Sequence, residues 1–141
     1  MATTRTAHTE WNGDLKNGSG EVAFDSSGIG KQAVTWASRA EEPNGRTSPE
    51  ELIAAAHSSC FSMALSNGLA SAGSPPSRLS TRADVTFQPG TGITGVHLTA
   101  QGEVPGIDEA AFVAAAEEAK ANCPVSQALS GTTITLTAKL G

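Results

Sequence analysis

The sequence contains two cysteines, Cys60 and Cys123, and thiols are the groups in this chain with the most distinctive chemistry. An ionised thiol is a nucleophile and a metal ligand, and two thiols that meet can be oxidised to a disulfide. Two cysteines do not make a structural disulfide framework, so they are either inert core residues or redox-active residues. Free cysteine is among the most buried residue types, and composition therefore leaves both interpretations open.

His57 lies three residues before Cys60, so the two side chains would share one face of a helix. A thiol and an imidazole can form a nucleophilic pair, but such a histidine usually has a third group that fixes its tautomer. The sequence favours a histidine that packs or hydrogen-bonds at an interface. A zinc site is disfavoured, because no C-x-x-C or H-x-x-x-H spacing occurs and a fourth ligand would have to come from His8, His97 or a carboxylate.

Cys60 falls in a segment with a clear helix start. Ser48 is the predicted N-cap, Pro49 occupies the first helical position, and Glu51 would complete a capping box with Ser48. The helix is predicted to run to about residue 72, before the Gly-Ser-Pro-Pro stretch at 73–76. Residues at helical spacing form an apolar stripe that is expected to be buried: Ile53, Ala56, Cys60, Met63, Ala64 and Asn67.

Glu50 stands beside the capping residue Glu51 but has no predicted local role at the helix start. It precedes Cys60 by ten residues, or about 15 Å along a straight helix, so a direct contact is not expected. A long cation would have to connect the two, or the glutamate would have to come from a second subunit. Arg39 and Arg46 are the arginines near the helix entry that could supply this cation.

Cys123 lies at the junction of two predicted helical segments. Asp108 is expected to cap an amphipathic helix over 109–122, and Pro124 ends or kinks that helix. If a short helix restarts there, Cys123 is its N-cap and Pro124 lies in its first turn. Unpaired backbone N–H groups at such a position favour the Cys123 thiolate.

Short runs with β propensity surround the helices. They predict a three-stranded meander over 8–13, 20–26 and 31–38, and three further strands over 78–88, 95–104 and 132–140. Residues 39–48 contain Pro, Asn and Gly in succession and are expected to form a loop. The order of strands, long helix, strands, helix and strand predicts an α+β fold in a single domain over 1–141.

The composition argues against several classes of function. The formal net charge is −5 at pH 7 and 4% of the residues are aromatic, which disfavours a nucleic-acid surface and an anionic membrane surface. No apolar run approaches the ~18 residues that span a bilayer. The segment MATTRTAHTEW lacks the apolar core of a signal peptide, so the expected compartment is the cytoplasm.

Several segments resemble the OsmC/Ohr family of osmotically inducible protein C and organic hydroperoxide resistance proteins, and its OsmC branch most closely. The specific ones are SPEELIAAAHSSCFSMALS and CPVSQAL, supported by WNGDLKNGSGEV and VPGIDEAAF. The resemblance implies an OsmC-like α+β fold and an intertwined homodimer with two active sites at the subunit interface. It also implies a thiol-dependent peroxidase in which Cys60 is the peroxidatic cysteine and Cys123 the resolving one.

The resemblance also assigns two charged residues to the site. The family's arginine falls on Arg39 and its glutamate on Glu50. The stretch between Arg39 and Pro49 is one residue longer than the family pattern, and Ala40 replaces a bulkier aromatic residue. Arg46 is therefore kept as the alternative arginine.

By this resemblance, the enzyme reduces alkyl or fatty-acid hydroperoxides to alcohols in oxidative or osmotic stress defence. Cys60 is oxidised to a sulfenic acid, which Cys123 converts to an intramolecular disulfide. An external dithiol, for example on a lipoylated protein or thioredoxin, must restore both thiols. No cofactor, haem or metal is needed. Two alternatives stay open: a non-enzymatic stress-related module that binds an apolar ligand in the dimer cleft, and a stable dimer with inert cysteines.

Overall fold

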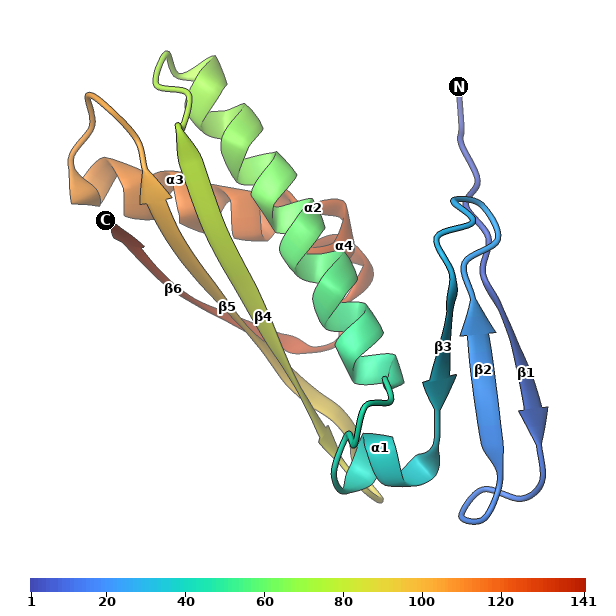
Figure 1. Ribbon diagram of the computed structural model, residues 1–141. Coiled ribbons are helices and arrows are strands. Elements are labelled where there is room, and N and C mark those ends of the chain that lie inside the picture. The colour runs from blue at the N-terminus through green and yellow to red at the C-terminus, as the bar shows by residue number, and fades with distance from the viewer. The chain divides into compact units, whose positions relative to one another are not determined.

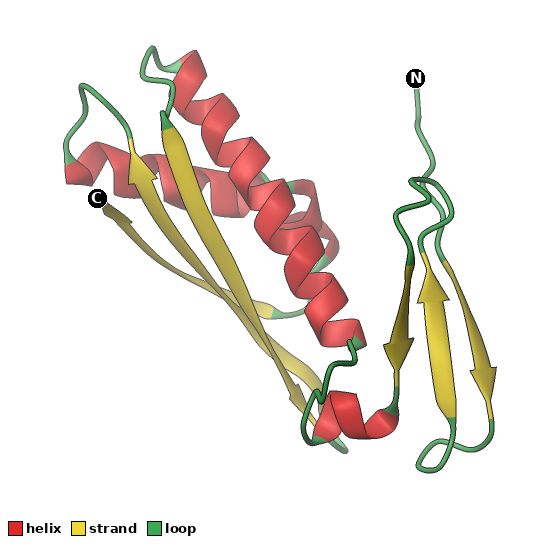
Figure 2. Ribbon diagram, viewed as in Figure 1, coloured by secondary structure: helices red, strands yellow, loops and turns green.

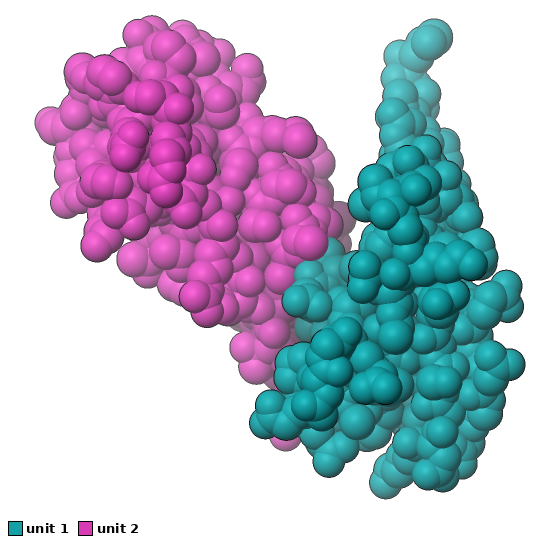
Figure 3. Space-filling model, in the orientation of Figure 1, with its two compact units in different colours: residues 1–52 teal, residues 53–141 magenta.

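The structure, a computed structural model, describes all residues from 1 to 141 and contains both helices and strands (Figures 1 and 2). The chain divides into two compact units, an N-terminal unit of residues 1–52 and a C-terminal unit of residues 53–141 (Figure 3). The predicted α+β fold is confirmed. No helix combines the length and the apolar character that crossing a membrane requires.

Groups of strands and groups of helices alternate along the chain. In chain order the elements are β1 (His8–Asn12), β2 (Ser19–Ala23), β3 (Lys31–Val34), α1 (Trp36–Ala40), α2 (Pro49–Ser71), β4 (Arg78–Gln88), β5 (Gly92–Glu103), α3 (Glu109–Asn122), α4 (Pro124–Ala128) and β6 (Thr133–Leu140).

The sheet of the N-terminal unit is an antiparallel meander in the order β1-β2-β3, as predicted. Gly20 in β2 pairs with Trp11 in β1, and a Cβ at position 20 would lie 2.6 Å from the Trp11 ring. Within the three strands, Val22 and Ala23 are the buried residues. A three-stranded sheet with so little apolar burial has almost no core of its own.

The prediction of a strand over 31–38 is wrong at its end, because helix α1 begins at Trp36. Thr35 caps this helix reciprocally: its hydroxyl accepts from the Ser38 N–H at 3.0 Å, and the Ser38 hydroxyl accepts from the Thr35 N–H at 3.0 Å. These two hydrogen bonds outweigh the strand propensity of threonine and tryptophan. Helix α1 also extends into the predicted loop over 39–48.

The sheet of the C-terminal unit has the order β4-β5-β6, with β4 antiparallel and β6 parallel to β5. Helices α3 and α4 form the crossover connection that a parallel pair needs. Exposed and half-buried residues alternate along β4 and β6, and alternate β5 residues from Val96 to Gly102 are fully buried. All three predicted strands are confirmed, although β5 begins at Gly92, earlier than predicted.

Helix α2 starts and ends close to the predicted positions. The Ser48 hydroxyl accepts from the Glu51 N–H at 3.1 Å, as the capping box requires. The reciprocal half of that box is wrong, because the Glu51 carboxylate accepts from the Thr47 hydroxyl at 2.6 Å instead. At the other end, Gly73 adopts a left-handed conformation with φ 91°, which terminates the helix.

The buried face of α2 differs from the predicted stripe. The buried residues of α2 in the C-terminal unit are spaced four apart: His57, Phe61, Leu65 and Leu69. Of the predicted stripe, Met63 is 72% exposed and Cys60 is half-buried at the border of the core. Alanine and other apolar residues occur on nearly every face of this helix, so periodicity could not single out one face.

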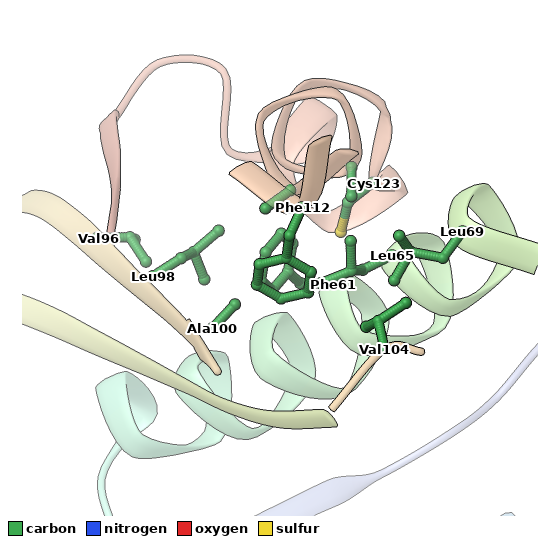
Figure 4. Packing of buried hydrophobic residues seen from close by; sticks show 11 residues of the cluster. Phe61, Leu65, Leu69, Val96, Leu98, Ala100, Val104, Phe112 and Cys123 are labelled. Atoms are coloured by element: carbon green, nitrogen blue, oxygen red, sulfur yellow. The ribbon is translucent and has the colours of Figure 1, made fainter. Parts of the chain in front are cut away.

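The core of the C-terminal unit gathers side chains from the sheet and from α2 and α3 (Figure 4). Phe61 and Phe112 are fully buried there, and Cys123 belongs to the same cluster. Gly102 in β5 makes room for one of these rings, since a Cβ at this position would lie 2.7 Å from Phe112 Cε1 and 3.0 Å from Leu79 Cδ2. The close approach of strand and ring fixes α3 on the sheet.

Replacing Gly102 by alanine should destabilise the protein by about 1–3 kcal/mol, because the added methyl group must displace a tightly packed ring. Urea unfolding of the wild type and the variant measures this free energy. Gly131→Ala is the matched control, since a Cβ at that position would meet no atom within 4 Å. Equal stability of Gly102→Ala and the wild type would contradict the described packing.

Candidate active site

The two cysteines are far apart in sequence but meet in the C-terminal unit. Cys60 is half-buried in the middle of α2, and Cys123 is fully buried between α3 and α4. Both are free thiols, and the Cys123 side chain is close enough to Cys60 to raise the pKa of the Cys60 thiol. Contact between two thiols is the first requirement for converting them to a disulfide.

The backbone of Cys123 is held from both sides. Its N–H donates to the Ala119 carbonyl at 2.9 Å, which closes α3, and its carbonyl accepts from the Gln127 N–H at 3.0 Å, which opens α4. Cys123 is the N-cap of α4 and Pro124 follows it, as predicted, but the thiol makes no capping hydrogen bond. The side chain is therefore left to face Cys60.

Burial raises the pKa of the Cys60 thiol, and the Cys123 side chain raises this pKa further. The backbone N–H of Val125, in the first turn of α4, acts on Cys60 and lowers the same pKa. The sequence predicts that amides of this short helix favour a Cys123 thiolate, whereas the structure directs one of them to Cys60. The net effect is a raised pKa, so the contacts of the single chain keep Cys60 protonated near neutral pH.

His57 is completely buried and pairs with a hydroxyl group, not with a thiol. Its Nε2 lies 2.7 Å from Ser126 Oγ, and its Nδ1 is buried without a partner. Burial lowers the pKa of the imidazole, which favours its neutral form. The structure therefore supports the packing and hydrogen-bonding role expected for His57. The sequence did not predict a role for Ser126. A spacing of three could have indicated it, because Ser126 lies three residues after Cys123 and His57 lies three residues before Cys60.

Arg39 and Glu50 form an ion pair within the N-terminal unit. Arg39 Nε lies 3.0 and 3.1 Å from the two carboxylate oxygens of Glu50, and Arg39 Nη2 lies 2.9 Å from Oε2. The Glu50 side chain is 8% exposed and that of Arg39 is 30% exposed. A two-pronged contact of this kind fixes the plane of the guanidinium. Arg46, the alternative arginine, is exposed.

An apolar groove between α2 and α3, within the C-terminal unit, contains Cys60. Its volume is about 1030 Å³, and alanine is the most frequent residue in its lining. Cys60 and Pro124 lie on its wall, and Met63, also on the wall, is 72% exposed. The half-buried Cys60 thiol can thus be reached from this groove, whereas the Cys123 thiol is shielded by the core.

The remaining histidines make contacts elsewhere. His8 Nδ1 lies 2.7 Å from an Asp25 carboxylate oxygen, and this hydrogen bond raises the pKa of His8. His97 Nδ1 lies 2.6 Å from the Thr135 hydroxyl oxygen. No three side chains of histidine, cysteine, aspartate or glutamate gather in an arrangement that could hold a metal ion.

Comparison with known proteins agrees with this arrangement. Residues 42–139 match the family described as OsmC-like protein. The protein named peroxiredoxin OsmC from Escherichia coli strain K12 is 42% identical over 132 residues, which are 92% of this chain and 92% of that protein. An organic hydroperoxide resistance protein from Elizabethkingia anophelis is similar in structure with a TM-score of 0.73 and 26% identity, over 100% of both chains. The organic hydroperoxide resistance protein OhrB of Bacillus subtilis has the same fold with a TM-score of 0.72 at 21% identity, over 96% of this chain and 98% of that one.

These similarities confirm three predictions made from the sequence. The resemblance to the OsmC/Ohr family and the OsmC-like α+β fold both hold. The prediction of a peroxiredoxin-like peroxidase is confirmed at the level of enzyme class by the name of the relative. Since the family match spans more than half of the chain and the relative is 42% identical over 92% of it, the chain belongs to the OsmC family.

Proposed function

We propose that the protein reduces organic hydroperoxides to alcohols in defence against oxidative stress, with Cys60 as the attacking thiol and Cys123 as the resolving thiol. The observation that carries this proposal is the contact between a groove-lining Cys60 and a fully buried Cys123. The relative named peroxiredoxin OsmC supports the same reaction class. A pair of inert structural cysteines would not need one thiol on the wall of a large groove.

In the first step, the Cys60 thiolate attacks the distal oxygen of the hydroperoxide. A sulfur–oxygen bond forms and the oxygen–oxygen bond breaks, so the sulfur is oxidised to a sulfenic acid and the peroxide leaves as an alkoxide that takes up a proton. The reaction needs the thiolate, yet burial and Cys123 raise the pKa of Cys60. The Val125 N–H is the one contact described that opposes them, so a further stabilising charge is required.

The ion pair of Arg39 and Glu50 is the proposed source of that charge. Glu50 is nearly buried and accepts hydrogen bonds from two nitrogen atoms of the Arg39 guanidinium. These bonds fix the orientation of a group that stays positively charged. Such a cation stabilises both the thiolate and the negative charge on the leaving oxygen. Glu50 precedes Cys60 by ten residues, about 15 Å along the helix, so a direct contact within one chain is not expected. In the proposed homodimer, the pair would act on the sulfur of the second chain.

The active form is proposed to be an intertwined homodimer with residues 1–141 of each chain forming one OsmC-like domain. The β1-β2-β3 sheet buries almost none of its own residues, and small sheets of this kind need a further surface to pack against. Large apolar side chains are exposed on both units, namely Trp11, Leu15, Ile29 and Met63. A second chain that covers them would supply the missing apolar contacts.

In the second step, the Cys123 thiolate attacks the sulfur of the Cys60 sulfenic acid. A sulfur–sulfur bond forms, the sulfur–oxygen bond breaks, and the oxygen leaves as hydroxide, which takes up a proton to become water. An external dithiol then reduces the disulfide and is itself oxidised, which returns both cysteines to thiols. The alanine-rich groove beside Cys60 favours a hydroperoxide with an alkyl chain over hydrogen peroxide, because apolar substrate surface is buried there.

One equivalent of an alkyl hydroperoxide should consume both thiols of the reduced wild type and lower its mass by about two hydrogen atoms, as a disulfide requires. A thiol assay and intact mass spectrometry follow the two changes. Cys123→Ser should stop at a Cys60 sulfenic acid that a dimedone-type reagent traps. Equal thiol loss in Cys60→Ser, or binding of an apolar ligand with no peroxide turnover in the wild type, would contradict the proposal.

Replacing Arg39 by alanine should slow the reaction of Cys60 with hydroperoxide at pH 7 by about 10²-fold, the typical effect of removing one transition-state donor. Because burial raises the pKa of Cys60, the rate of the variant should recover as the pH rises and the thiolate forms without the cation. Stopped-flow peroxide consumption between pH 6 and pH 9 measures both effects.

Arg46→Ala is the matched control for this experiment, because it removes the neighbouring exposed arginine. Its rate and pH profile should equal those of the wild type. If Arg46→Ala shows the loss and Arg39→Ala does not, the assignment of the arginine is wrong.

A further inference from the structure

The hydrogen bond between His57 and Ser126 is not used by the chemistry proposed above. The two side chains are 0% and 5% exposed, and His57 Nε2 lies 2.7 Å from Ser126 Oγ. The other ring nitrogen, Nδ1, is buried without a partner. An apolar side chain of similar size would avoid this unsatisfied group, so stability alone does not explain a histidine at this position.

The imidazole–hydroxyl pair runs beside the thiol pair along the same two segments. His57 lies three residues before Cys60 on α2, and Ser126 lies three residues after Cys123 in α4. The Val125 N–H also acts on Cys60, since it lowers the pKa of that thiol. Two consecutive residues of α4 are therefore tied to about one turn of α2, which fixes how the short helix docks beside the reacting sulfur.

We propose that His57 and Ser126 are positioning residues for disulfide formation, holding α4 on α2 so that Cys123 stays beside Cys60 after the first oxidation. This inference rests on the proposed peroxidase function. Oxidation replaces the Cys60 thiol by a sulfenic acid and thereby changes every hydrogen bond that the sulfur makes. The contact between His57 and Ser126 contains no sulfur, so it persists through the catalytic cycle and keeps the two cysteines close.

The sulfenic acid of Cys60 has two competing fates. The Cys123 thiolate can attack it to form the disulfide and release water, or a second hydroperoxide can add an oxygen to the sulfur, giving a sulfinic acid and a further molecule of alcohol. The first reaction is intramolecular and slows when Cys123 is displaced, whereas the second does not involve Cys123. The ratio of disulfide to sulfinic acid therefore reports the position of α4.

In the full-length protein, Ser126→Ala should form the disulfide roughly two- to tenfold more slowly relative to sulfinic acid than the wild type, as expected for one lost hydrogen bond. An alkyl hydroperoxide titration with intact mass spectrometry separates the disulfide, two hydrogens lighter, from the sulfinic acid, about 32 Da heavier. His57→Phe removes the same bond while filling the space, and gives a second measurement if Ser126→Ala does not fold. His57→Gln, whose amide can replace Nε2, should restore the wild-type ratio.

Ser62→Ala is the matched control, because the Ser62 hydroxyl also links α2 to another element, β4, through a 2.6 Å hydrogen bond with Thr81. It should change thermal stability without changing the ratio of products. A wild-type ratio in Ser126→Ala and His57→Phe would overturn the inference, as would an equal shift in Ser62→Ala. A wild type that forms neither product would instead overturn the proposed peroxidase function.

Discussion

The contact between the Cys60 and Cys123 side chains is the constraint on which the rest of the account depends. It arises from the topology of the C-terminal unit, in which the parallel pairing of β5 and β6 forces the chain to cross over through α3 and α4. Both α2 and α3 contribute to the core that covers this sheet, so the residue that follows α3 reaches α2. The proposed two-thiol reaction is thus a consequence of the strand order.

The site must also solve an electrostatic conflict. In the proposed mechanism, shielding from water protects the sulfenic acid of Cys60, but the same burial raises the pKa of Cys60 and disfavours the thiolate. The C-terminal unit supplies one opposing contact, the Val125 N–H, while the oriented guanidinium of Arg39 lies in the N-terminal unit. In the proposed mechanism, each unit therefore holds one half of what the reaction requires: the sulfur pair in one and the cation in the other.

Local signals in the sequence predicted most of the secondary structure. The Ser48 cap, the Asp108 cap and the alternating strands are set by neighbouring residues, and each is found close to its expected place. The half-buried border position of Cys60 was not predicted, because α2 is apolar on nearly every face and only the tertiary fold selects the buried one. The hydrogen bond between His57 and Ser126 joins residues that are 69 apart in the sequence, and a pattern of neighbouring residues cannot predict such a pair.

The disulfide that joins Cys60 to Cys123 within one chain is the most direct test of the account. A mixture of ¹⁴N- and ¹⁵N-labelled reduced protein is oxidised with one equivalent of alkyl hydroperoxide, digested with trypsin without reduction and analysed by mass spectrometry. We expect the peptides Thr47–Arg78 and Ala121–Lys139 to be joined by a disulfide and to carry the same isotope. Mixed-isotope pairs in proportion to chance, or separate peptides with no disulfide, would contradict it.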